Sequence, residues 1–397
     1  MRNKYFTFLA FVLLCNAPQA QLKTEFRGVW IATVTNIDWP ETNMRDGESQ
    51  KASFIKLLDE HKKNGINAII MQIRPAADAL YHSTMEPWSH WFTGKQGLPP
   101  QPWYDPLEFM ISETHKRNME FHAWLNPYRA VFNVNTNDPA PTHVTRIHPE
   151  WFVKYGDKLY FDPSNQETRK FVAHIVRDLV KRYEVDAIHF DDYFYPYKIA
   201  GKEFPDEATY RKSGTKLSKA DWRRSNVDSI ISLVSRTIRK YKPGCEFGIS
   251  PFGVWRNSDK DPLRGSKTRA GVTNYDDLYA DILLWMKNDW IDYVAPQIYW
   301  ETTSRAVPFD TIVEWWNQNT CGKKCYIGIG IYRAGTNNAW RKKDELPKQI
   351  QKIRSLPNLQ GMAFYSSKVL VKNPNGWTDS LRQHYFKQPA LPSSVRK

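Results

Sequence analysis

Eight alternations of strand-like and helix-like sequence restrict the fold of this chain more than any other feature. From residue 26 to residue 386, short apolar segments rich in Val, Ile and aromatic residues alternate with longer amphipathic segments. The strands that we expect are 26–33, 68–74, 120–125, 185–190, 246–251, 293–299, 326–331 and 361–365. The helices that we expect are 49–64, 105–118, 165–183, 221–241, 275–288, 309–319, 344–354 and 378–386. Because parallel strands need a crossover connection, the alternation predicts a parallel sheet covered by helices.

Eight β/α units in about 360 residues are typical of a (β/α)8 TIM barrel, here with long βα-loop insertions. The two longest expected loops, 76–104 and 130–164, both follow strands. A doubly wound open sheet is the alternative fold. Such sheets often have a glycine-rich phosphate turn after the first strand, and the sequence has none there. No long linker interrupts the pattern, so residues 23–387 are predicted to form one domain.

Both ends of the chain are predicted to lie outside this domain. Arg2 and Lys4 precede an apolar run and then small residues that suit signal peptidase. This order is typical of a signal peptide over residues 1–20, and it predicts export to the periplasm or the cell surface. Alternatively, Cys15 is lipidated and attaches the protein to the envelope. Residues 388–397, rich in Pro and Ser, are predicted to be disordered.

The net charge and the aromatic content indicate which class of molecule the protein binds. The formal net charge is +14, and the chain has 16 Trp and 20 Tyr. Basic proteins often bind nucleic acid or other anionic polymers. The sequence has no Arg/Lys-rich helix and no nucleic-acid-binding motif, so a polysaccharide is the expected partner and nucleic acid is not. We expect a monomer.

No metal or other cofactor is expected. Cys321 and Cys325 enclose three residues, which suits either a disulfide in an exported protein or half of a zinc site. No second Cys or His pair has matching spacing, so the disulfide is the favoured interpretation.

The segment 185–196 is the strongest candidate for the centre of a site. A buried strand ends there in two adjacent carboxylates, Asp191 and Asp192, followed by aromatic residues and Pro196. In a (β/α)8 barrel, catalytic groups lie at the carboxyl ends of the strands. One aspartate could instead cap the following turn while the other forms a buried ion pair. The adjacent pair, with His189 just before it, favours a catalytic role.

The carboxyl ends of the other strands supply the remaining candidates. The catalytic candidates are Asp191, Asp192 and Glu301. The predicted substrate-binding residues are Arg74, Asn126, Tyr128, His189, Gln297, Tyr299, Trp300 and Tyr365. The set contains no serine-hydrolase elbow, no His-Glu-x-x-His metal motif and no phosphate loop.

Carboxylates with stacking rings are what glycosidic cleavage requires. One acid protonates the leaving oxygen, and a second group stabilises or attacks the oxocarbenium-like centre. A strand-four aspartate could be the nucleophile with Glu301 as the acid across the barrel mouth, or those roles could be exchanged. In the third pairing, Asp191 and Asp192 act together: one orients the 2-acetamido group of the substrate as an internal nucleophile, and the other is the acid.

Three candidates have a structural alternative. Glu301 could be a solvated loop acid. Arg74 could form an ion pair with a strand-four aspartate and fix its geometry. His189 could be a core histidine whose nitrogens are hydrogen bonded inside the barrel.

Five ordered motifs resemble the bacterial glycosyl hydrolase-like 10 family. They begin at Phe26, Gln72, Ala123, His189 and Ala295, and they end at Thr33, Pro75, Arg129, Pro196 and Trp300. The resemblance extends from about residue 23 to about residue 370. It implies an exported or lipid-anchored TIM-barrel glycoside hydrolase, and a relative of this family acts on denuded peptidoglycan glycan strands.

The resemblance also implies site residues. Matched motif by motif, they are Asp191, Asp192, Arg74, Asn126, Tyr128 and Gln297. Family-10 xylanases use glutamates at strands four and seven, and this chain has neither, so a xylanase activity is not implied.

The sequence therefore predicts an exported glycosidase that cleaves a bacterial wall glycan or a related amino-sugar polymer. The alternative from a different class is a polysaccharide-binding barrel without catalysis. An amidase or deacetylase on the same polymer is disfavoured because the metal-ligand spacing is missing.

Overall fold

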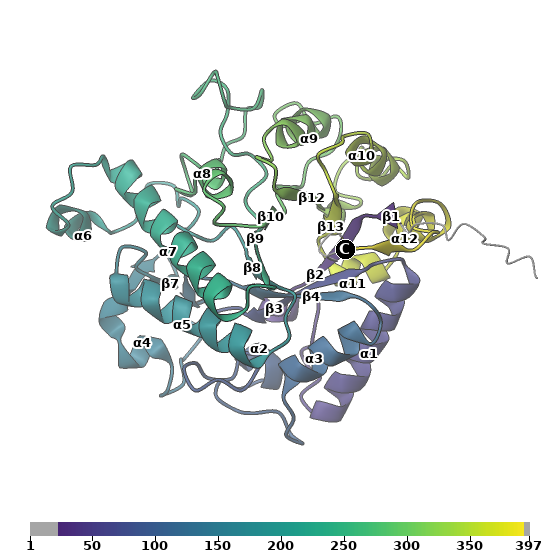
Figure 1. Cartoon of the computed structure of the whole chain (residues 1–397). Coiled ribbons are helices and arrows are strands. Elements are labelled where there is room, and N and C mark those ends of the chain that lie inside the picture. The colour runs from purple at the N-terminus through teal and green to yellow at the C-terminus, as the bar shows by residue number, and fades with distance from the viewer. Residues whose placement is uncertain (1–22, 393–397) are drawn as a thin grey trace, which may run out of the picture.

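Within residues 23–392, which the computed structural model describes, eight parallel strands pair edge to edge and close into a barrel (Figure 1). The barrel strands are β2 (Phe26–Ile31), β3 (Ala68–Arg74), β4 (Glu120–Leu125), β8 (Ala187–Phe190), β9 (Glu246–Ile249), β10 (Tyr293–Val294) with β11 (Gln297–Ile298), β12 (Lys324–Ile329) and β13 (Gly361–Phe364). The ring closes because β10 pairs with both β9 and β12. The predicted (β/α)8 barrel is confirmed, and the sixth strand is split in two.

Helices surround the barrel on its outside (Figure 1). They are α1 (Gly47–Lys63), α3 (Pro106–His115), α5 (Gln166–Arg182), α7 (Lys219–Tyr241), α8 (Ile282–Lys287), α9 (Phe309–Gln318), α10 (Glu345–Arg354), α11 (Ser367–Val371) and α12 (Trp377–Ser380). Within residues 23–392, no helix is long and apolar enough to cross a membrane.

Side-chain caps explain where several of these helices begin. The carboxylate of Asp46 accepts a hydrogen bond from the Ser49 amide at 2.8 Å, and Asn165 does the same for the Glu167 amide. Such caps satisfy amide groups that have no partner inside the helix.

The helix predicted over 275–288 is wrong in its first half. Only Ile282–Lys287 is helical, and Tyr279 has a φ of +53° that a helix cannot accommodate. Asp281 then caps the short helix by accepting from the Leu284 amide. The predicted helix 378–386 is also replaced by α12 and a π-helical turn, Leu381–Tyr385.

Two long insertions follow β3 and β4. The first contains the short helix α2 (His90–Thr93). The second is an antiparallel sheet of β5 (Arg129–Val131), β6 (Phe152–Tyr155) and β7 (Lys158–Phe161), followed by α5. A further loop after β8 contains α6 (Glu207–Lys212). All three rise from the carboxyl ends of strands, where they enlarge one face of the barrel.

The two ends of the described segment pair with each other. β1 (Lys23–Thr24) forms a parallel pair with β14 (Ala390–Leu391), so the disorder predicted from residue 388 is wrong up to residue 392. The backbone oxygen of Gln388 also accepts from the Arg27 guanidinium at 2.9 Å. The predicted signal peptide, Cys15 and residues 393–397 lie outside the described residues.

The predicted disulfide is absent. Cys321 and Cys325 are free thiols, because Cys325 is fully buried on β12 while Cys321 is exposed in the turn before it.

The ring of Tyr293, on β10, lies in the buried cluster that fills the barrel, where it packs against Tyr326. Gly248 makes this possible, since a Cβ there would lie only 1.9 Å from Cζ of Tyr293. The Tyr293 hydroxyl lies 2.9 Å from Nδ1 of His189 and 2.8 Å from Nδ1 of His122. All these groups are fully buried, so their hydrogen bonds cannot be exchanged for bonds to water.

The neighbouring groups determine the direction of this hydrogen-bond chain. The indole of Trp30 donates to Nε2 of His189 at 3.3 Å. His189 must therefore hold its proton on Nδ1 and donate it to Tyr293, since burial lowers its pKa and keeps it neutral. Tyr293 then donates to His122, whose other nitrogen lies 3.2 Å from the carboxylate of Glu120. One continuous chain thus links β2, β8, β10 and β4.

Tyr293→Phe keeps the ring and removes the hydroxyl. We expect the free energy of unfolding to fall by about 2–4 kcal/mol, because two buried histidine nitrogens each lose a partner. Urea denaturation measures this change. Tyr241→Phe, on the exposed end of α7, is the matched control and should stay within about 0.5 kcal/mol of wild type. If the two variants were equally stable, the Tyr293 hydroxyl would not stabilise the fold through the buried hydrogen bonds described above.

Candidate active site

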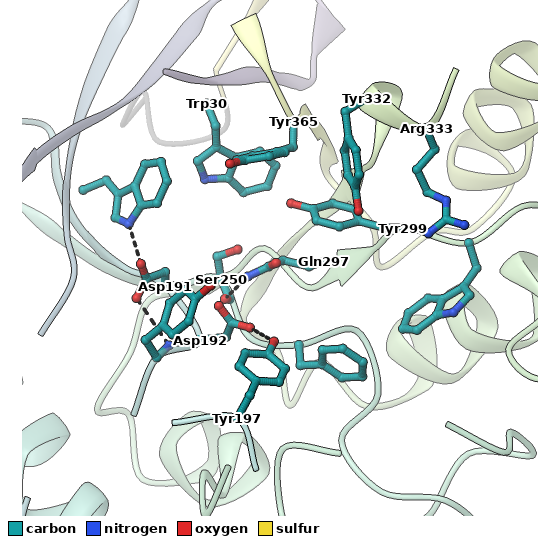
Figure 2. Close-up of a pocket in the computed structure, with 14 residues that line it drawn as sticks. Trp30, Asp191, Asp192, Tyr197, Ser250, Gln297, Tyr299, Tyr332, Arg333 and Tyr365 are labelled. Carbon is teal, nitrogen blue, oxygen red and sulfur yellow. Dashed lines mark hydrogen bonds between the residues drawn. The ribbon is translucent and has the colours of Figure 1, made fainter. Parts of the chain in front are cut away.

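A cavity of about 370 Å³ opens at the carboxyl ends of the barrel strands (Figure 2). The residues that line it are Trp30, Trp124, Asp191, Asp192, Tyr193, Tyr197, Ser250, Phe252, Gln297, Tyr299, Trp300, Tyr332, Arg333 and Tyr365. Most of these side chains are aromatic rings, and Asp191 and Asp192 are the only acidic ones that line the cavity within the described part of the chain.

Asp191 is the first residue after β8, and the protein holds it by both carboxylate oxygens. Oδ2 accepts from Nε1 of Trp124 at 3.0 Å and from Nδ2 of Asn126 at 3.1 Å, while Oδ1 accepts from the amide of Tyr193 at 3.3 Å. Only 4% of the residue is exposed. Burial raises the pKa of Asp191 to about 7, with a further contribution from the charge of Asp192. The carboxyl can therefore hold a proton at neutral pH.

Asp192 lies beside it and points toward the middle of the cavity (Figure 2). Its carboxylate accepts a hydrogen bond from the hydroxyl of Tyr197. Burial raises the pKa of Asp192, while hydrogen bonds from Tyr197 and Gln297 oppose the rise by stabilising the charged form. Two buried carboxyls on consecutive residues titrate as a coupled pair, in which one retains its proton after the other has ionised.

Arg129 supplies positive charge behind the pair. Its guanidinium lies 4.7 Å from the ring of Tyr193. Its positive charge opposes the rise that burial causes in the pKa of both aspartates. Its amide donates to Oδ1 of Asn126 at 2.8 Å, so the same amide side chain orients both Arg129 and Asp191. Arg129 therefore limits how far burial can raise the two pKa values.

Aromatic rings form the wall opposite Asp191 (Figure 2). The ring of Tyr299 stacks on that of Tyr365 with centroids 5.8 Å apart, and Tyr332 meets both rings edge-on. Phe252 and Trp300 meet edge to face at 5.4 Å. Rings grouped in this way offer flat apolar faces on which a sugar ring can stack.

Six of the residues predicted from the sequence meet in this cavity. They are Asp191, Asp192, Gln297, Tyr299, Trp300 and Tyr365. Nε2 of Gln297 donates to the backbone oxygen of Ser250 at 3.0 Å, which fixes the amide at the cavity wall. Their positions suit the predicted roles, and the roles themselves stay predictions.

The prediction that Arg74 and Tyr128 bind substrate is wrong. Arg74 is fully buried, forms its ion pair with Glu86 rather than with a strand-four aspartate, and donates to the backbone oxygen of Asn126. Tyr128 is also fully buried and does not line the cavity. Neither side chain can contact a sugar there. Arg74 instead holds the turn that carries Asn126.

Asn126 and His189 are also buried beneath the cavity rather than exposed in it. Asn126 acts on the site through its hydrogen bond to Asp191. His189 is a core histidine, since both of its nitrogens are occupied by Trp30 and Tyr293. The prediction that these two side chains bind substrate directly is wrong.

Glu301 does not reach the cavity either. Its carboxylate accepts from the indole of Trp340 at 3.0 Å, and it is not among the lining residues. The geometry therefore gives no support to the two pairings that use Glu301 across the barrel mouth, and they stay predictions. The adjacent aspartates remain as the pair that can act together.

Sequence reasoning missed several residues of the site. Tyr193 follows the aspartate pair directly and supports its catalytic interpretation from the sequence, whereas Trp124, next to the end of strand 120–125, and Tyr197, five residues after Asp192, are not among the predicted site residues. The inward alternation of strand 120–125 would have indicated Trp124. The contact of Tyr197 with Asp192 depends on the fold of the loop, which has no local sequence signal.

Within the described residues, no group of three or more His, Cys, Asp or Glu side chains is arranged to hold a metal ion. The expectation that the protein needs no cofactor stays a prediction.

Solved structures identify the class of fold. The glycoside hydrolase domain of PgaB (BpsB) from Bordetella bronchiseptica aligns over 91% of this chain and 98% of its own, with a TM-score of 0.57 and 14% identity. The catalytic domain of a beta-amylase from Paenibacillus polymyxa aligns over 92% and 99%, with a TM-score of 0.59 and 14% identity. The chain therefore has the TIM-barrel fold that glycoside hydrolases use.

Sequence comparison then identifies the family. The chain belongs to the Glycosyl hydrolase-like 10 family, which it matches over residues 25–346. It is 47% identical to glycosyl hydrolase YngK of Bacillus subtilis (strain 168) over 379 residues, which are 94% of this chain and 74% of that protein. It is 39% identical to glycosyl hydrolase DigH of Escherichia coli (strain K12) over 382 residues, which are 90% of this chain and 86% of that protein. The predicted family is confirmed.

Tyr197→Phe tests the contact with Asp192. A hydrogen bond to a charged group stabilises by about 1.5–3 kcal/mol, so we expect the pKa of Asp192 to rise by about one to two units. Carboxyl-carbon NMR titration measures this pKa without any substrate. Tyr210→Phe, whose hydroxyl donates to the backbone oxygen of Leu217 and does not line the cavity, is the control and should leave the pKa of Asp192 unchanged. An unshifted pKa in Tyr197→Phe would show that the hydroxyl does not bind the carboxylate in solution.

Proposed function

We propose that this protein is an exported glycoside hydrolase that cleaves a bacterial wall glycan, or a related polymer of N-acetylated amino sugars. The observation that supports this most strongly is the pair Asp191 and Asp192, buried side by side in a cavity lined with aromatic rings. Membership of a glycosyl hydrolase-like family agrees with the reaction type.

The placement of the two acids favours one mechanism. Double displacement and direct inversion each need two carboxyls on either side of the scissile bond. Asp191 and Asp192 are consecutive residues that leave a single strand, so both approach the sugar from the same side. Substrate-assisted cleavage fits this arrangement, because the second nucleophile is the acetamido group of the substrate itself.

The steps follow from that geometry. The protonated member of the pair donates its proton to the glycosidic oxygen, and the bond from that oxygen to the anomeric carbon breaks. The acetamido oxygen attacks the anomeric carbon and forms a cyclic oxazolinium, while the ionised carboxylate accepts a hydrogen bond from the acetamido N–H. The first carboxyl, now ionised, then removes a proton from the water that opens the ring.

The basic surface and the aromatic wall support the choice of polymer. Loss of the predicted signal peptide removes the charges of Arg2 and Lys4 and leaves a formal net charge of +12, which would attract the lactyl carboxylates of a denuded wall glycan through screened long-range attraction. The rings of Tyr299, Trp300 and Tyr365 would stack on its sugars. Export follows the predicted signal peptide, with lipidation at Cys15 as the alternative, and we propose a monomer that needs no cofactor and no nucleic acid.

The direct test is incubation of the purified protein with peptide-stripped peptidoglycan glycan, with products measured by mass spectrometry. We expect soluble fragments from wild type and at least a hundredfold slower release from Asp191→Asn and from Asp192→Asn, because each loses a group that acts on the reacting atoms. Asp276→Asn, in a loop acid that pairs with Arg256 and does not line the cavity, is the control.

Leaving-group dependence assigns the two roles. An aryl N-acetylglucosaminide with a strongly acidic leaving group needs no proton donor, so the variant that lacks the acid should recover activity on it. The variant that lacks the acetamido contact should stay slow on every substrate. If both variants respond alike, the division of roles between Asp191 and Asp192 is wrong.

The raised pKa of Asp191 predicts how kcat/KM changes with pH. The pKa of Asp191 is raised to about 7, so the proton that the pair retains is present below that pH and lost above it. We expect kcat/KM to fall as pH rises through about 7, and to fall again in acid when both carboxyls are protonated. A rate profile that rises through pH 7 would contradict an acid in this pair.

A polysaccharide-binding barrel without catalysis is the second candidate. It shares the rings and the charge, and the same incubation separates the two. Binding of the glycan without any product, on this and on plant or host glycans, would establish the binding protein.

A further inference from the structure

Arg333 is a cation that lines the cavity, and its side chain has no hydrogen-bond or ion-pair partner among residues 23–392. It ends the 3-10 helix η3 (Ile331–Arg333), which follows β12, and its side chain lines the cavity on the side opposite Asp191 (Figure 2). Nε of Arg333 is buried and has no hydrogen-bond partner. Among residues 23–392, no carboxylate forms an ion pair with it.

Among residues 23–392, three of the four buried arginines form ion pairs, and the fourth, Arg129, forms none but acts electrostatically on Asp191 and Asp192. Arg27 lies 2.7 Å from Glu25, Arg74 lies 2.5 Å from Glu86, and Arg223 lies 2.6 Å from Asp206. Removing guanidinium N–H groups from water without a partner costs free energy, which is why such groups are normally paired. At Arg333 the open cavity is the side from which a partner can come.

The chemistry of that partner follows from the guanidinium. Its planar set of N–H donors matches the two oxygens of a carboxylate, which it can bind with two parallel hydrogen bonds. The two aspartates of the cavity already accept hydrogen bonds from Trp124, Asn126 and Tyr197. An anionic group on the substrate is therefore the ligand that the geometry leaves for Arg333.

We propose that Arg333 binds a carboxylate carried by the sugar polymer, so that the enzyme selects an acidic amino-sugar glycan over a neutral one. This inference rests on the proposed function and names its substrate class. The carboxylate can belong to a lactyl ether on an amino sugar or to a neighbouring uronic acid. Both offer the same two oxygens, and separate substrates distinguish them.

The test compares charged and neutral substrates of equal length. The substrates are oligosaccharides from peptide-stripped peptidoglycan, the same oligosaccharides with their carboxyls reduced, hyaluronan oligosaccharides and chitooligosaccharides. Loss of a charge-assisted hydrogen bond corresponds to about a 10- to 100-fold change, so kcat/KM of Arg333→Gln should fall by that factor on the preferred acidic substrate. It should stay within about twofold of wild type on the neutral ones, and Arg333→Lys should recover part of the loss.

The matched control is Arg236→Gln, which removes one positive charge from the exposed face of α7, outside the cavity. It should change none of these ratios. The preferred acidic substrate, peptidoglycan-derived or hyaluronan-derived, then identifies the source of the carboxylate. Equal losses on charged and neutral substrates, or no loss at all in Arg333→Gln, would overturn the proposal.

A binding measurement separates this proposal from the proposed function. Calorimetry with the disaccharide of N-acetylglucosamine and N-acetylmuramic acid, and with di-N-acetylchitobiose, needs no turnover. We expect wild type to bind the acidic disaccharide more tightly and Arg333→Gln to lose that preference. If wild type cleaves nothing but shows this preference, the proposed function fails and the role of Arg333 stands. If wild type cleaves glycan but binds both disaccharides equally, the role of Arg333 fails alone.

Discussion

The hydroxyl of Tyr293 is the contact on which the inside of the barrel depends. It joins His189 to His122, and through them Trp30 to Glu120, so one chain of hydrogen bonds crosses the barrel between four strands. Polar groups buried this deeply are tolerated only when each has its partner. Gly248 leaves the space for the ring, so the chain requires both a tyrosine at one position and the absence of a side chain at another.

The candidate site stands directly on this interior. The indole N–H of Trp30 donates a hydrogen bond to His189 in the barrel interior, while the ring of Trp30 lines the cavity. Asp191 extends from the strand that carries His189, and Trp124 from the strand that carries His122. The carboxyls therefore sit on a dry, filled barrel, and that dryness is the cause of their raised pKa values. Arg129 and the donors around Asp191 keep the rise within a useful range.

Much of the fold and part of the site could be predicted, for physical reasons that differ from residue to residue. Short apolar runs identify the parallel strands in the sequence, and the carboxyl ends of such strands lie at the same end of a barrel. Asp191, Asp192 and Gln297 follow or end these strands, so the sequence could place them together. The partner of Arg74 could not be placed in this way, because Glu86 reaches it from an irregular loop. The same limit applies to Glu301, whose indole partner comes from a distant loop, and to Tyr279, whose positive φ ends a helix pattern without any Gly or Pro.

The pairing of β1 with β14 has a consequence for how the molecule can be held. β1 leads directly into the amino end of β2, so both ends of the described chain leave the barrel together on the face away from the cavity. Paired strands lie about 5 Å apart, a gap that a linker of a few residues can bridge. A support or fused domain attached at either terminus would leave the mouth of the barrel facing outward. The same adjacency makes the fold suited to circular permutation, with new termini opened in a surface loop.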